Sequence, residues 1–122
     1  MISEKVPARS EYDYDTDTFF ARPMKRTYSS SFQTGNIIFD IDENDKIVGL
    51  ELLNASKVFN LPKISLKNPK DMMIRIIVSE TSIEVDISIR VSRRNSESTS
   101  SLSIERVKPD FLRPSEMDLA FT

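Results

Sequence analysis

The stretch Ile83-Glu84-Val85-Asp86-Ile87-Ser88-Ile89-Arg90-Val91-Ser92 decides the fold class. Its odd-numbered positions are all Ile or Val, and its even-numbered positions are all polar or charged. Strict alternation of this kind is typical of a β-strand with one buried face and one solvated face. An amphipathic helix would instead space its apolar residues three and four positions apart. The stretch therefore predicts a long strand in an antiparallel sheet.

Similar patterns on both sides extend the strand prediction to most of the chain. Residues 72–78 are apolar except for Arg75, which indicates a central strand before this stretch. After a polar loop over 93–98, we expect another strand with Leu102, Ile104 and Val107 pointing inward. Shorter alternating or apolar runs predict further strands at 18–22, 28–33, 37–41 and 47–53, and an edge strand at 117–121.

The expected fold class is mainly β, a single domain of antiparallel hairpins and a meander with one short helical turn near residues 54–60. A chain of 122 residues is the size of one domain. Asn54 is the expected N-cap of the helical turn. We expect an irregular N-terminal segment over 1–9 and a single β-rich domain over 10–122. That domain divides into a β module at 10–60, a connector at 61–70, and a meander with the C-terminal tail at 71–122.

Composition excludes many classes of chemistry. The sequence has no histidine and no cysteine, which removes imidazole bases, disulfides, and thiolate or imidazole metal sites. Its 2 glycines cannot form a glycine-rich phosphate loop. We therefore expect no enzyme activity and no cofactor. No signal peptide or run of about 18 apolar residues is present, so we expect no membrane association and a cytoplasmic location.

The acidic hairpin at 40–51 has the oxygen spacing of a calcium loop. Asp40, Asp42, Asn44 and Glu51 occupy positions 1, 3, 5 and 12 of that pattern. The flanking residues alternate as strands rather than helices, so a solvated hairpin turn is the favoured interpretation and no metal is predicted.

Two alternative functions depend on charged residues. An RNA- or ribonucleoprotein-binding protein would use the only adjacent basic pairs, Lys25-Arg26 and Arg93-Arg94. A metal-dependent hydrolase would use the carboxylates Asp15, Asp17, Asp40 and Asp42. Exposed loop charge is the simpler interpretation of both sets.

Three segments resemble a known family, the domain of unknown function 2283. They are Tyr14-Asp15-Thr16-Asp17-Thr18-Phe19-Phe20, Gly35-Asn36-Ile37-Ile38-Phe39-Asp40-Ile41-Asp42-Glu43 and Ile47-Val48-Gly49-Leu50-Glu51-Leu52-Leu53-Asn54-Ala55-Ser56. The most specific part is the structural signature Gly49, Glu51, Asn54, Ala55 and Ser56. The sequence departs from the family where most members carry glycine in the hairpin turn, since Asn44-Asp45-Lys46 stand there.

The resemblance implies a small β-rich module without an established activity, and an antitoxin-like role toward a small ribonuclease is one expectation that it supplies. Residues 72–78 are apolar on both faces, and a small sheet can bury only one, so either the N-terminal half of the chain or a second subunit must cover the other. We therefore expect a non-catalytic protein–protein interaction module. It would form a homodimer through an exposed strand edge, or neutralise or scaffold a partner protein.

Overall fold

The alternating stretch lies in β7 (Ser82–Arg93), which pairs with β6 (Asp71–Val78) on one side and β8 (Ser96–Val107) on the other. The computed structural model describes residues 4–24 and 28–121. The apolar side chains of β7, from Ile83 to Val91, are at most 2% exposed. The strand prediction for this stretch is therefore confirmed.

The described strands form one sheet, and the mainly β, mostly antiparallel class is confirmed. The remaining elements are β1 (Glu4–Asp13), β2 (Thr18–Pro23), β3 (Ser30–Thr34), β4 (Ile37–Ile41), β5 (Ile47–Leu52), α1 (Ala55–Phe59), the 3-10 helix η1 (Lys63–Leu66) and β9 (Ser115–Phe121). The nine-stranded sheet has the order β3-β4-β5-β2-β1-β9-β6-β7-β8. β1 and β9 pair in parallel and the other neighbours are antiparallel.

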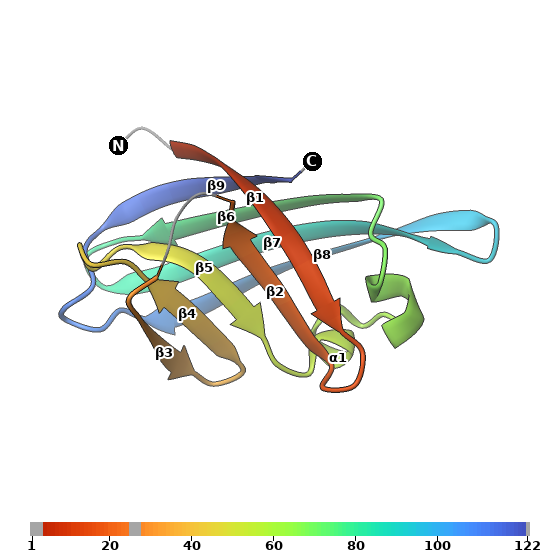
Figure 1. Ribbon diagram of the computed structural model, residues 1–122, viewed down its shortest axis with the longest axis horizontal. Helices are drawn as coiled ribbons and strands as arrows, with labels where there is room; N and C mark the ends of the chain where they lie inside the picture. Colours follow the sequence, from red (N-terminus) through yellow and green to blue (C-terminus); the bar gives the residue numbers. More distant parts are fainter. Residues whose placement is uncertain (1–3, 25–27, 122) are drawn as a thin grey trace.

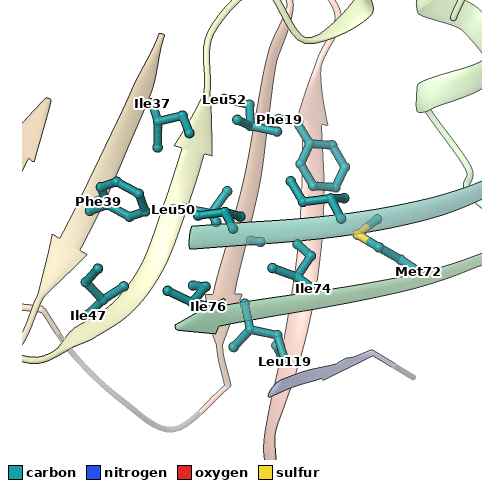
Figure 2. Close-up of a cluster of buried hydrophobic side chains, with 14 of the residues drawn as sticks. Phe19, Ile37, Phe39, Ile47, Leu50, Leu52, Met72, Ile74, Ile76 and Leu119 are labelled. Carbon is teal, nitrogen blue, oxygen red and sulfur yellow. The ribbon is translucent and has the colours of Figure 1, made fainter. Parts of the chain in front are cut away.

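The sheet folds over so that its two halves face each other across one core. Figure 1 shows β1 and β2 crossing β6, β7 and β8. Phe39 and Leu50 from the first half lie in the same buried cluster as Ile74 and Leu119 from the second (Figure 2). At one end of this core, the Phe59 ring of α1 packs edge-on against Phe19, with 5.7 Å between ring centroids. Apolar burial on facing sheet surfaces is what stabilises this arrangement.

Two terminal segments differ from the sequence prediction. Residues 4–9, expected to be irregular, belong to β1, which lies in the middle of the sheet between β2 and β9. Only Val6 and Ala8 alternate as buried residues here, and this pattern is too short to predict a strand from the sequence. Long-range pairing with β2 and β9 stabilises the strand instead. β9 forms as predicted, but it is an internal strand and not an edge. The edges of the described sheet are β3 and β8.

The hairpin between β7 and β8 is tighter than predicted. The expected loop over 93–98 is wrong, because Arg93 pairs with Ser96 and only Arg94 and Asn95 connect the strands. Their φ angles are 45° and 68°, as a two-residue type I′ turn requires. Leu102 and Ile104 pack against the core as predicted. Val107 is 84% exposed, so its predicted inward direction is wrong.

Candidate functional site

Asp17 fixes the beginning of α1. This residue is 8% exposed and has a left-handed backbone with φ 55°. Its Oδ1 accepts hydrogen bonds from the Tyr12 hydroxyl (2.6 Å) and the Ser56 amide (3.0 Å), and its Oδ2 accepts one from the Ser56 hydroxyl (2.6 Å). Asn54 is itself left-handed and makes no side-chain capping bond. Asn54 therefore occupies the predicted N-cap position without capping the helix through its side chain, and a carboxylate distant in sequence does the capping.

The same contacts determine the charge of this cluster. Burial alone would raise the pKa of Asp17, but the hydrogen bonds from Ser56 and Tyr12 outweigh it and hold the pKa below its ordinary value. Burial and the bond to Asp17 raise the pKa of Tyr12. Asp17 is thus an ionised carboxylate whose two oxygens are occupied by structural donors. Sequence reasoning placed Ser56 in the signature but missed Tyr12 and Asp17 as its partners.

Gly49 and Asp40 form a second cluster, on the outer face of the sheet. The two residues lie directly opposite each other on β5 and β4. A Cβ at Gly49 would lie 2.9 Å from the Ala21 carbonyl oxygen and 3.2 Å from Asp40 Oδ2, so only glycine leaves room here. Asp40 is 1% exposed, and its Oδ1 accepts a hydrogen bond from the Ser31 hydroxyl at 3.0 Å. Its Oδ2 is buried and has no hydrogen-bond partner among the described residues.

Arg22 joins this cluster to Glu51. Its Nε lies 3.6 Å from Asp40 Oδ2 and its Nη2 lies 3.7 Å from Glu51 Oε2. Its guanidinium carbon is 5.2 Å from the centroid of the Phe20 ring and 5.7 Å from that of Tyr28. Burial, followed by repulsion from Asp40, raises the pKa of Glu51. Sequence reasoning did not connect Arg22 with Asp40, because only the pairing of β2, β5 and β4 brings the two residues together.

A hollow of about 360 Å³ lies beside this cluster. Its lining residues are Arg9, Arg22, Pro23, Met24, Tyr28, Asp40 and Val48. Met24 and Tyr28 are 58% and 51% exposed, so apolar surface is open to solvent here. Arg9 lies directly opposite Arg22 on the β1–β2 ladder.

The four oxygen ligands considered for a calcium loop do not converge. Asp40 and Glu51 lie on the outer face of the sheet, whereas Asp42 and Asn44 lie in the β4–β5 turn. Asp42 Oδ1 accepts hydrogen bonds from the backbone amides of Asn44 (2.8 Å) and Lys46 (3.1 Å). Asp45 takes a left-handed backbone with φ 60° in the same turn, a conformation that glycine adopts more readily than other residues. Within residues 4–24 and 28–121, no three acidic side chains gather as a metal site would need.

The carboxylates of the hydrolase alternative are also separated. Asp17 caps α1, Asp40 lies beneath Arg22, and Asp42 shapes a turn. Asp15 is an exposed residue of the β1–β2 turn. These four carboxylates therefore do not come together in one site.

The basic residues considered for RNA binding can be placed only in part. Lys25 and Arg26 lie outside the described residues. Arg93 and Arg94 are exposed at the tip of the β7–β8 hairpin, which projects beyond the rest of the sheet (Figure 1).

The β8 strand presents an open backbone edge. The Lys108 amide donates to the Thr81 carbonyl at 3.0 Å, and the β7–β8 register runs without a shift from Val107 to Ser96. Bonded and non-bonded pairs alternate in an antiparallel ladder, so the even-numbered residues of β8 bond to β7. The odd-numbered residues direct their N–H and C=O groups away from it; they are Glu97, Thr99, Ser101, Ser103, Glu105 and Val107. No described strand pairs with that side.

Together, the folded sheet and its two polar clusters define a small, mainly β protein without a recognisable catalytic centre among the described residues. A family model described as "Protein of unknown function (DUF2283)" matches residues 9–56, a segment that contains both polar clusters. The chain belongs to this family, which confirms the resemblance seen in the sequence.

Two relatives extend the comparison. A Methanosarcina mazei protein named "Putative hypoxanthine phosphoribosyltransferase" is 38% identical over 95 residues, which cover 78% of this chain and 77% of that protein. That match is longer than the family segment, so the similarity continues into the second half of the chain. An uncharacterized protein of Methanocaldococcus jannaschii is 34% identical over 61 residues, covering 50% of this chain and 53% of that protein. No solved structure matches the chain.

Proposed function

We propose that the protein is a non-catalytic interaction module that associates with a second copy of itself through the edge of β8. The observation that carries this proposal is the length and regularity of the open edge. β8 has twelve residues, no proline and no register shift. Sheet proteins usually protect such an edge with short strands, prolines, bulges or lysines, and an unprotected edge is a template for another strand.

The side chains of β8 favour a second copy as the partner. The outward-facing residues in its middle are Thr99, Ser101 and Ser103, which are small and uncharged. Hydroxyl side chains opposite one another in an antiparallel pair stabilise it, and the absence of charge avoids repulsion between identical strands. With Ser101 on the two-fold axis, Glu97 of one copy lies opposite Glu105 of the other near the ends of the pair. Arg90, 3.0 Å from Glu97, offsets part of their repulsion. A two-fold axis through the middle of β8 would produce an isologous dimer.

A binding role is also consistent with the chemistry available. The sequence has neither histidine nor cysteine, and the carboxylates considered for catalysis are separated or engaged in structural bonds. Among the described residues, no helix is long and apolar enough to cross a membrane. We propose a cytoplasmic location, because a chain without cysteine suits a reducing compartment.

The name of the Methanosarcina mazei relative raises phosphoribosyl transfer as an alternative. Phosphate groups are commonly held by glycine-rich loops at helix N-termini. The two glycines of this chain lie elsewhere, Gly35 in the β3–β4 turn and Gly49 within β5. We therefore do not extend that name to this protein.

The proposal is tested by replacing Ser101 with proline. Proline removes an outward-facing amide and leaves the backbone bonds to β7 intact, since the Ser101 amide does not donate to β7. The bond from the Ser101 hydroxyl to Ser88 of β7 (3.3 Å) is lost in the proline variant and in the alanine control alike. Light scattering at micromolar concentration should give twice 14.0 kDa for the native chain and 14.0 kDa for Ser101→Pro. The control Ser101→Ala keeps the amide and should remain a dimer.

Both variants should keep the circular dichroism spectrum of the native chain, so that a change in mass reflects pairing and not unfolding. A native chain with the mass of one copy would overturn the proposal, as would a Ser101→Pro variant that stays dimeric.

A further inference from the structure

We propose that the hollow beside Arg9 and Arg22 binds a phosphate ester attached to a planar ring, as in a mononucleotide. This inference is independent of the β8 edge, because the hollow lies on β1, β2, β4 and β5.

The two arginines bring positive charge together at the hollow. Arg9 and Arg22 are directly opposite neighbours on an antiparallel ladder, where like charges destabilise each other. Both side chains line the hollow. No described side chain pairs with Arg9, whereas the Arg22 guanidinium lies 3.6 Å from Asp40 and 3.7 Å from Glu51. An oxyanion between the two guanidinium groups would relieve their mutual repulsion. It would also accept hydrogen bonds from the guanidinium N–H groups of Arg9 and Arg22.

Arg22 is already oriented by its neighbours. Asp40 and Glu51 lie 3.6 and 3.7 Å from its nitrogens, and aromatic rings lie on its flanks. Asp40 is buried, so the exposed charges that line the hollow are both positive. A guanidinium fixed before binding loses less conformational entropy when an anion arrives.

Beside the two arginines, the hollow offers apolar and aromatic surface to the rest of the ligand. Tyr28, Met24 and Val48 give the hollow an apolar wall, and the Tyr28 ring is 51% exposed. Exposed aromatic rings next to cationic side chains are stacking surfaces for nucleic-acid bases. The combination of an oxyanion position and a stacking surface defines the ligand class.

Calorimetric titration with adenosine monophosphate, inorganic phosphate and adenosine tests this inference. Adenosine monophosphate should bind more tightly than either fragment. Arg9→Gln should weaken its binding by about tenfold, since a charge-assisted bidentate bond is lost. Tyr28→Leu should weaken the binding of adenosine monophosphate and leave the affinity for inorganic phosphate unchanged.

Lys5→Gln is the matched control. Lys5 is an exposed cation on β1 that does not line the hollow, so its loss changes net charge equally and should leave affinity unchanged. Equal losses in Lys5→Gln and Arg9→Gln would overturn the inference, as would the absence of binding by every probe. A single-stranded oligoribonucleotide identifies the source of the phosphate: binding of this probe alone, weakened by Arg9→Gln, would support the site with RNA as its ligand.

Discussion

At the scale of single residues, two polar side chains are buried for different structural purposes. Asp17 replaces a local cap at α1, and Asp40 fills the space that Gly49 leaves open. Both carry charge into the protein, and each is held by donors supplied from other strands or from α1. The signature residues Gly49 and Ser56 therefore have a physical explanation in packing and hydrogen bonding, which the sequence alone could suggest but not assign.

The Asp17→Asn variant should be less stable at neutral pH by about 1–3 kcal/mol, because hydrogen bonds to a buried charged group are lost. The pKa of Asp17 is lowered by folding, so its stabilisation is present above the ordinary value of 3.8 and disappears as the pH falls through the folded value. Urea unfolding should therefore show a difference from the native chain at pH 7 that shrinks below pH 3.8.

Asp15→Asn is the control for this measurement. Asp15 lies exposed in the same turn, and its side chain makes no hydrogen bond to a described residue. Its replacement should change stability little at either pH. A pH-independent loss in Asp17→Asn would contradict the assignment of an ionised cap.

At the scale of elements, alternation identifies strands well and their ends poorly. The strands around Ile87, Ile74 and Phe39 follow directly from their apolar spacing. The turn at Arg94 and Asn95 was missed because neither residue is glycine, although both have positive φ. β1 was missed because its pairing with β9 joins distant parts of the chain, which local patterns do not encode.

The strained turn leads to a prediction about Arg94. Arginine is unfavourable at a φ of 45°, whereas asparagine tolerates this region. Arg94→Asn should raise the free energy of unfolding by about 0.5–1 kcal/mol. Arg93→Asn, which removes the same charge from a regular strand position, should give no such gain. Equal effects in the two variants would indicate a charge effect instead of backbone strain.

At the scale of the whole molecule, the sequence predicts one shared core but not how the sheet closes around it. The apolar pattern of residues 72–78 predicts cover on both faces. Within the chain, the inner side of β6 faces the first half of the sheet, whereas Met73 on the outer side is 65% exposed. The candidate sites could not be predicted from the sequence for the same reason. The Arg22–Asp40 contact and the open β8 edge depend on the order of strands in the sheet, which the alternation of apolar residues does not reveal.

The most direct test of self-association is amide hydrogen exchange along β8, resolved by nuclear magnetic resonance. Even-numbered amides bond to β7 and should be protected at every protein concentration. If β8 pairs with a second copy, the amides of Thr99, Ser101 and Ser103 should also be protected, and their protection should increase with protein concentration. Rapid exchange at these three residues beside slow exchange at Ser100 and Leu102, at all concentrations, would contradict pairing through this edge.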